Sequence, residues 1–342
     1  MHALYMAASG CPIGNLDSQN PAAAACIINC MGRVIAVDIG GTHMRAAVYD
    51  SNNPQPLAHE RLDTRADLPG AYERLQGLVR SIWPKDGSVT AIGVASPGPL
   101  DPHLGVILKT PNIPEWRDFP LVPRLSADFG VPAFLDNDGN AAALGEWMFG
   151  AAKGHHDALY ITVSTGIGAG VIVNDALMRG FHGLAAELGH VIIDPDGPPC
   201  NCGFHGHVES FSSGPAIVRY VLEQLGKGVA SSLRPDQDLS ARSIAEAAMQ
   251  GDALAIAAYR RAGEYLGIAV ASFLHAFDPS IVVFGGGVSL VGPLLFDPFH
   301  ASLKQRVFHP RYLEGLKIEM GALGDDAGLL GALALAQIST QV

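Results

Sequence analysis

A strand, a glycine-rich turn and a second strand occur twice in this chain, and the repeat limits the possible folds more than any other feature. The first copy spans Val34–Asp50 and the second spans Ala158–Asp175. A repeated supersecondary unit indicates a duplicated architecture. Two α/β units that face each other would place both glycine turns at one cleft. We therefore expect an N-terminal α/β domain at 31–150 and a C-terminal α/β domain at 151–342, with the last helix as a candidate to pack on the N-terminal domain.

Residue patterns predict the elements of these domains. Runs of strand-forming residues predict strands at Arg33–Ile39, Arg45–Asp50, Val89–Ala95, Val131–Leu135, Ala158–Ser164, Val171–Asn174 and Ser280–Phe284. Apolar residues at helical spacing predict helices at Leu68–Trp83, Leu121–Phe129, Asn140–Phe149, Ser243–Met249, Asp252–Phe277 and Asp326–Gln337. The proline-rich stretch 111–123 is expected to be irregular.

Composition narrows the class of protein. Of the 342 residues, 48% are hydrophobic and 16% are charged, which suffices for sizeable cores. The formal net charge of −11 argues against nucleic acid as the main partner, because phosphate backbones are bound by clustered Lys and Arg. No apolar stretch of about 18 residues occurs, so no membrane-spanning helix is expected.

Residues 1–30 differ from the rest of the chain. They contain the apolar run from Ala22 to Cys30. A signal peptide requires a positively charged segment before such a run, and no Lys or Arg precedes this one. We expect a leader that is disordered or not translated, with Met31 as the natural start. Beyond it the only cysteines are Cys200 and Cys202, and this usage favours a reducing, cytoplasmic compartment.

Three glycine turns are candidates for nucleotide binding: Asp38–Thr42, Ser164–Gly170 and Gly285–Ser289. Glycine lets backbone N–H groups approach a phosphate, Asp38 could hold Mg²⁺ through water, and the third turn could carry adenine or ribose. Each turn alone could equally be a hairpin or strand end that needs glycine. The second turn is not a dinucleotide fingerprint, because a strand follows it. The chain has no GxxxxGK[ST] motif, which argues against a Walker-type kinase.

Asp138 follows a predicted buried strand and precedes a predicted helix. It could be an N-cap, which is worth about 1 kcal/mol, a general base that accepts a hydroxyl proton, or both. Asn137 beside it suits a neighbouring hydroxyl, because a hydroxyl both donates and accepts hydrogen bonds. Glu187 and His190 would share one face if their segment is helical.

A cluster of histidine and cysteine follows. His190, Cys200, Cys202 and His207 could form a tetrahedral Zn²⁺ site, with His205 as an alternative fourth ligand. Without a metal, the two cysteines would form a turn with buried thiols. Four protein ligands leave no open position, so this zinc would be structural and would fix the loop that carries Glu209.

The motifs of the chain resemble those of the ROK family (repressors, open reading frames, sugar kinases) in the actin-like ATPase superfamily. They are DIGGT at 38–42, DNDGNAAALGE at 136–146, STGIGAG at 164–170, ELGH at 187–190, CNCGFHGHVE at 200–209 and GGGVS at 285–289. The resemblance covers Val34–Gln337. It implies two actin-like (ribonuclease H-like) α/β domains that face each other across a cleft, with a zinc-binding insertion at 187–209. The family's third zinc cysteine is replaced here by His207.

The resemblance also implies roles for individual residues. Asp138 would deprotonate the sugar 6-hydroxyl, and His190 would bind zinc through one ring nitrogen and sugar through the other. The sugar would be bound by Asn137, Glu187, His190 and Glu209, with Gly98 and Thr110 lining the same pocket. ATP and Mg²⁺ would be bound by Asp38, Gly40, Gly41, Thr42, Thr165, Gly166, Gly168, Gly286 and Gly287.

The activity that follows from the resemblance is ATP-dependent phosphorylation of a hexose 6-hydroxyl. Glucose is the first choice, and N-acetylmannosamine, fructose and N-acetylglucosamine are alternatives. A sugar-sensing repressor of the same family is disfavoured, because residues 1–30 contain no basic recognition helix. The implied cofactors are ATP with Mg²⁺ and structural Zn²⁺, and the implied assembly is a homodimer or homotetramer.

Overall fold

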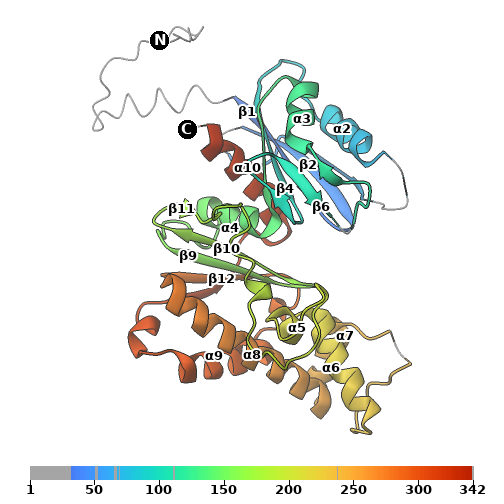
Figure 1. Ribbon diagram of the computed structural model, residues 1–342, viewed down its shortest axis with the longest axis vertical. Coiled ribbons are helices and arrows are strands. Elements are labelled where there is room, and N and C mark those ends of the chain that lie inside the picture. Colours follow the sequence, from blue (N-terminus) through green and yellow to red (C-terminus); the bar gives the residue numbers. More distant parts are fainter. Residues whose placement is uncertain are drawn as a thin grey trace.

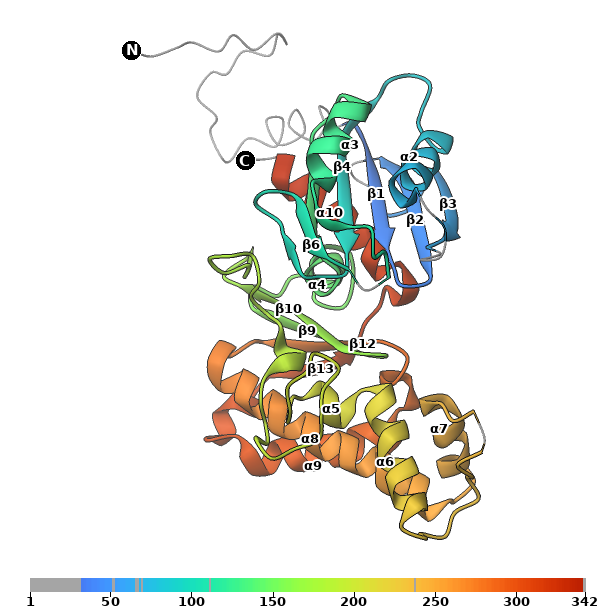
Figure 2. The same ribbon diagram turned by 45° about the vertical axis from the view of Figure 1, so that its right-hand side comes forward.

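The computed structural model describes residues 32–50, 53–64, 68, 70–110, 112–236 and 238–340. The expected leader at 1–30 lies outside these residues. Two lobes, each built on a five-stranded sheet, lie end to end along the molecule (Figures 1 and 2). The first copy of the repeated unit belongs to one sheet and the second copy to the other. The predicted pair of α/β units is therefore confirmed.

The N-terminal lobe has a sheet in the order β3-β2-β1-β4-β8 and a small sheet of β5, β6 and β7. In β1, Ile35 and Val37 pack with the helices α2 and α3, whereas Val34 and Ala36 pack with α10. Both faces of the sheet are thus covered, which explains why the four residues from Val34 to Val37 are all apolar and buried. The elements are β1 (Arg33–Ile39), β2 (His43–Asp50), β3 (Ala58–Asp63), α2 (Ala71–Ser81), β4 (Val89–Ser96), β5 (Leu100–Asp101), β6 (Val106–Lys109), β7 (Arg117–Phe119), α3 (Leu121–Phe129), β8 (Ala133–Asn137) and, from the end of the chain, α10 (Ala327–Thr340).

The C-terminal lobe has a sheet in the order β11-β10-β9-β12-β13. Strand β9 is antiparallel to β10 and parallel to β12, as β1 is to β2 and β4. The two sheets therefore repeat one topology. The elements are α4 (Asp138–Phe149), β9 (Ala158–Val163), β10 (Ile167–Val173), β11 (Ala176–Leu177), η1 (Leu188–His190), α5 (Glu209–Ser212), α6 (Gly214–Gly226), α7 (Ala241–Met249), α8 (Ala253–Phe277), β12 (Ile281–Gly285), η2 (Ser289–Val291), α9 (Pro293–Arg306), η3 (Pro310–Leu313), β13 (Lys317–Met320) and η4 (Gly324–Asp326).

Helices α4 and α10 lie between the two sheets and contact each other. Helix α10 packs on β1 and β4 of the N-terminal sheet, whereas α4 packs on β9 and β10 of the C-terminal sheet. Glycine permits their close crossing, because a Cβ on Gly331 would lie 1.9 Å from the carbonyl oxygen of Ala141, and one on Gly145 would lie 2.9 Å from that of Ala327. A helix enclosed in this way is buried on all sides, and α10 is correspondingly apolar on every face.

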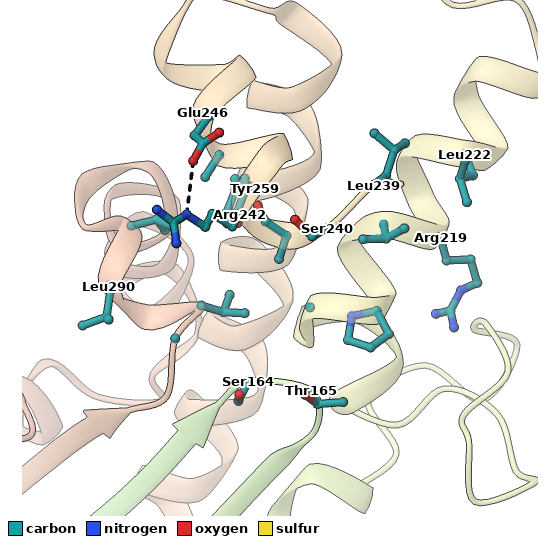
Figure 3. Close-up of a pocket in the computed structure, with 18 of the residues that line it drawn as sticks. Ser164, Thr165, Arg219, Leu222, Leu239, Ser240, Arg242, Glu246, Tyr259 and Leu290 are labelled. Atoms are coloured by element: carbon teal, nitrogen blue, oxygen red, sulfur yellow. Dashed lines mark hydrogen bonds and ion pairs between the residues drawn. The ribbon is translucent and has the colours of Figure 1, made fainter. Parts of the chain in front are cut away.

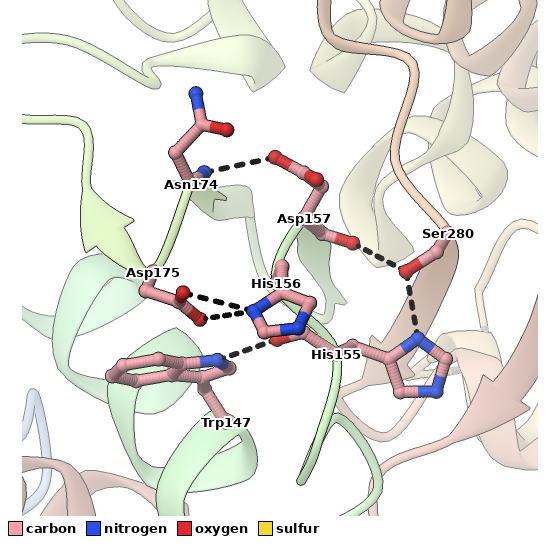
Figure 4. Close-up of polar contacts among 7 residues, drawn as sticks. All are labelled: Trp147, His155, His156, Asp157, Asn174, Asp175 and Ser280. Atoms are coloured by element: carbon pink, nitrogen blue, oxygen red, sulfur yellow. Dashed lines mark hydrogen bonds and ion pairs between the residues drawn. The ribbon is translucent and has the colours of Figure 1, made fainter.

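Polar contacts fix the connection that leads from α4 to β9 (Figure 4). The Trp147 indole N–H donates to the carbonyl oxygen of His155 at 2.7 Å. The Ser280 hydroxyl donates to the carbonyl oxygen of Asp157 at 2.9 Å, and its oxygen lies 2.7 Å from Nδ1 of His155. The start of β9 is therefore held beside the start of β12.

Some element boundaries differ from the predictions. Helix α2 begins at Ala71 and not at Leu68, because Gly70 has a φ of 74°, outside the helical region. Strand β10 begins at Ile167, so Gly168 and Gly170 lie in a strand and not in the predicted turn. A Cβ on Gly170 would lie 2.5 Å from the Cβ of Ala143 in α4. This glycine is needed for close packing of a helix on the sheet.

Other elements were not expected. The stretch predicted to be irregular contains β7, and α6, α9 and β13 lie where no element was predicted. Within the residues described here, none of the helices is both long and apolar enough to cross a bilayer.

Candidate active site

Asp138 lies where β8 of the N-terminal sheet passes directly into α4. The N-cap is Asn137, whose side-chain oxygen accepts a hydrogen bond from the Gly139 N–H at 2.8 Å. Asp138 is the first helical residue, so its expected N-cap role is wrong by one position. Its Oδ1 nevertheless lies 2.8 Å from the same N–H. With the cap supplied by its neighbour, the exposed Asp138 carboxylate is available to a bound molecule.

The surroundings of Asp138 make its carboxylate more basic than usual. The pKa of Asp138 is raised to about 6, chiefly by desolvation, while the Gly139 N–H lowers it and the carboxylates of Asp38 and Glu187 raise it. One side of the carboxylate is open to solvent, yet the protein around it displaces much of the nearby bulk water. Such a group is largely ionised at pH 7 and still accepts a hydroxyl proton readily.

Predicted sugar-binding residues gather beside this carboxylate. A Cβ on Gly98 would lie 3.2 Å from the amide nitrogen of Asn137 and 4.0 Å from Oε1 of Glu187, so these three residues line one space. Desolvation raises the pKa of Glu187, and His190 lowers it. Thr110 is buried directly after β6.

The first glycine turn places Asp38 near the end of β1. Oδ2 of Asp38 accepts a hydrogen bond from Nε of Arg45 at 3.1 Å, and Arg45 also donates to the carbonyl oxygen of Asp325 at 2.7 Å. A Cβ on Gly41 would lie 3.0 Å from the side-chain nitrogen of Asn112. Neither Arg45 nor Asn112 was predicted. Arg45 is the cross-strand partner of Asp38 in the β1–β2 hairpin, whereas Asn112 reaches the turn from a distant part of the chain.

The turn itself is closed by its own backbone. The N–H of Gly40 donates to the carbonyl oxygen of His43 at 2.8 Å, and the carbonyl oxygen of Thr42 accepts from the Thr64 N–H at 2.8 Å. Gly41 and Thr42 are exposed. Their backbone and hydroxyl groups are therefore accessible to a phosphate.

The second turn joins the predicted phosphate and sugar residues. Oε2 of Glu209 accepts a hydrogen bond from the Ile167 N–H at 2.9 Å, and a Cβ on Gly166 would lie 2.6 Å from that oxygen. A larger residue at this position would require the Glu209 carboxylate to move. Gly168 lies inside β10, opposite Thr162.

A cavity of about 1160 Å³ adjoins this second turn (Figure 3). Ser164 and Thr165 lie at its base, at the end of β9, and α6 and α7 form its walls along most of their lengths. Gly287 of the third turn lines it, and a side chain on Gly286 would lie 2.4 Å from the carbonyl oxygen of Val163. The lining is largely apolar, with the Ser164 and Thr165 side chains at the base and the Arg242–Glu246 ion pair farther away. A cavity of this kind suits a flat base joined to a polar tail.

The predicted metal ligands are brought together. The ligand atoms of His190, Cys200, Cys202 and His207 all lie within 4.8 Å of one another. Nδ1 of His190 lies 3.4 Å from Nδ1 of His207 and 3.9 Å from Sγ of Cys200, and Nδ1 of His207 lies 3.2 Å from Sγ of Cys202. In a tetrahedral zinc site the ligand atoms lie about 3.4–3.8 Å apart. The spacing therefore fits zinc, and His207, not the exposed His205, completes the group.

The fold consists of two repeated α/β lobes. Glycine turns lie at a cavity large enough for a nucleotide, and a basic carboxylate lies between the lobes. These features define a protein of the actin-like ATPase fold. The chain belongs to the ROK family, whose sequence profile matches residues 34–339.

Individual relatives agree with this assignment. The glucokinase of Thermotoga maritima is 35% identical over 309 residues, which cover 89% of this chain and 96% of that protein. The crystal structure of a ROK family glucokinase from Streptomyces griseus in complex with glucose and AMPPNP has a TM-score of 0.73 at 35% identity, and the match covers 90% of this chain and 100% of that one. The xylose repressor of Caldicellulosiruptor bescii is 32% identical over 89% of this chain and 78% of its own length.

Proposed function

We propose that this protein is an ATP-dependent hexose kinase that phosphorylates the 6-hydroxyl of glucose. The observation that carries the proposal is Asp138, an accessible carboxylate with a pKa raised to about 6, between the predicted sugar residues and the glycine turns. Two glucokinases that are 35% identical over about 90% of this chain support the same activity.

The proposed reaction divides the site between two substrates. Asn137, Glu187, His190 and Glu209 bind the sugar hydroxyls, with Gly98 leaving room for the ring. Asp138 accepts the proton of the 6-hydroxyl as its oxygen attacks the γ-phosphate in line. Because transfer of a phosphoryl group depends on positioning and charge stabilisation, the protein's main task is to align the two oxygens and neutralise the phosphate.

The nucleotide would occupy the cavity between α6 and α7. The apolar walls near Gly287 would hold its base, and Thr165, Gly166, Gly41 and Thr42 would bind its phosphates. Oδ1 of Asp38 would hold hydrated Mg²⁺, since its Oδ2 already accepts from Arg45.

Structural zinc is part of the proposal. His190, Cys200, Cys202 and His207 would hold it, and when bound it supplies rigidity to the loop rather than a reacting atom. Because Nδ1 of His190 faces the cluster, Nε2 of the same ring is left for a sugar hydroxyl. Thiolate ligands require reduced cysteines, which is consistent with a cytoplasmic location. We also propose that the protein forms a homodimer or homotetramer, which light scattering would test.

The test is sugar-dependent ADP release with Mg·ATP across glucose, mannose, N-acetylmannosamine, N-acetylglucosamine and fructose. We expect the highest kcat/KM on glucose and loss of turnover in both Asp138→Ala and the isosteric Asp138→Asn. If folded, zinc-loaded protein turned over none of these sugars, the proposed kinase activity would be refuted. If it preferred another sugar, the kinase activity would stand and glucose would be replaced as the proposed substrate.

A further inference from the structure

An ion pair with a buried carboxylate, outside the proposed catalytic set, joins the lobes next to the base. The Asp136 side chain is 0% exposed, and its Oδ2 accepts a hydrogen bond from Nε of Arg179 at 2.7 Å. Its Oδ1 accepts from the side chain of Asn140 and from the N–H of Asn137, each at 2.9 Å. A buried carboxylate is tolerated only with such a set of partners. Arg179 is therefore fixed relative to the end of β8, one residue before Asn137.

Arg179 comes from the other lobe and lies at the base of the loop that leads to Glu187. It follows β11, and its carbonyl oxygen accepts a hydrogen bond from the Ala185 N–H at 3.0 Å, which closes the loop. At the tip, a Cβ on Gly183 would lie 2.3 Å from Cδ of Pro102 in the N-terminal lobe. The side chain of Arg179 thus binds the end of β8, while its backbone holds the segment that leads into Glu187.

We propose that Arg179 is a positioning residue that holds Glu187 in register with Asn137 and Asp138. This inference rests on the proposed function. Glu187 binds the sugar, and Asp138 must lie within hydrogen-bond reach of its 6-hydroxyl. If the pair is broken, the loop carrying Glu187 shifts relative to the base, and a misplacement of about 1 Å can reduce the rate about 10²-fold.

The geometry also predicts which substrate is affected. Neither Asp136 nor Arg179 lines the nucleotide cavity, and neither does the loop between Arg179 and Glu187. Loss of the pair should therefore weaken the use of sugar and leave the affinity for ATP nearly unchanged.

The test uses Arg179→Met and Arg179→Lys in the full-length protein, with glucose and ATP varied separately. We expect Arg179→Met to lower kcat/KM for glucose about 10²-fold and to change KM for ATP by less than about twofold. Arg179→Lys should recover part of the loss, because it restores a positive charge beside Asp136. In the double variant Asp136→Asn/Arg179→Met, the fold loss in kcat/KM for glucose should be less than the product of the two single losses, because both substitutions remove the same interaction.

The matched control is Arg33→Met, because Arg33 pairs with the carboxylates of Asp50 and Asp86 at a similar exposure, away from the site. It should leave the glucose constants unchanged. The proposal is overturned if Arg179→Met leaves the glucose constants unchanged, or if the glucose and ATP constants change together in proportion to lost folded protein in a thermal melt.

Failure of the proposed function can be separated from failure of this inference. If the wild-type protein phosphorylates no sugar, hydrogen exchange of the Ala185 amide still reports whether Arg179 holds the loop. Faster exchange at Ala185 in Arg179→Met, with unchanged exchange in Arg33→Met, supports the proposal. Equal exchange in the wild-type protein and Arg179→Met overturns it.

Discussion

At the level of single residues, the direct passage from β8 into α4 sets the chemistry of Asp138. The helix begins at this residue, and its cap is the preceding Asn137. The sequence pattern was sufficient to place Asp138 between a buried strand and a helix, because that junction is a recognisable local signal. It could not reveal the pairing of Asp136 with Arg179, because these residues are 43 positions apart and meet only when the lobes have formed.

The pH dependence of the rate should report the basicity of Asp138. Only the ionised carboxylate accepts a proton, and the pKa of Asp138 is raised from 3.8 to about 6. The inactive protonated form therefore persists to higher pH than for an ordinary aspartate, so kcat/KM should rise with pH through about 6. Asp138→Asn should lose this dependence and lower kcat about 10²–10⁴-fold. Initial rates measured from about pH 5 to pH 8 test this, and a wild-type profile without a rise near 6 would contradict it.

At the level of elements, the repeated strand pair and long periodic helices were predictable, whereas close packing was not. The bounds of β1 and α3 agree with the predictions. Strand β10 was predicted to start too late, because Gly168 and Gly170 were interpreted as a turn. Glycine has two uses that sequence alone does not separate, since it forms turns and also allows close backbone approach.

The crossing of α4 and α10 provides a test of close approach. Gly331→Ala should destabilise the protein, because its Cβ would lie 1.9 Å from the carbonyl oxygen of Ala141, and overpacking of this kind costs about 1–3 kcal/mol. Gly77→Ala in α2 is the matched control. A Cβ added to Gly77 would meet open space, so it should stabilise the helix by about 1 kcal/mol. Denaturant unfolding of both variants gives the comparison, and equal effects would show that the crossing can relax.

At the level of the whole molecule, the duplication predicted two lobes but not how completely they share helices. The last helix of the chain covers the inner face of the N-terminal sheet, and α4, which follows β8 directly, covers the C-terminal sheet. Such sharing depends on contacts between distant segments, which no local pattern encodes. Helix α10 covers one sheet, α4 covers the other, and the two helices pack against each other. Unfolding of one lobe would therefore expose the helix that covers the other, so we expect the two lobes to unfold together.

Leu333 is the side chain that tests this coupling. It is fully buried in α10 and packs with residues of β1 and α4, so Leu333→Ala should lower the free energy of unfolding by about 2–5 kcal/mol. The exposed Leu104→Ala is the control and should change it by less than about 0.5 kcal/mol. Trp116 lies in the N-terminal core and Trp147 in α4, so tryptophan fluorescence of single-tryptophan variants follows each region separately. In Leu333→Ala both signals should shift to the same lower midpoint. A shift of one signal alone would mean that the lobes unfold independently despite their shared helices.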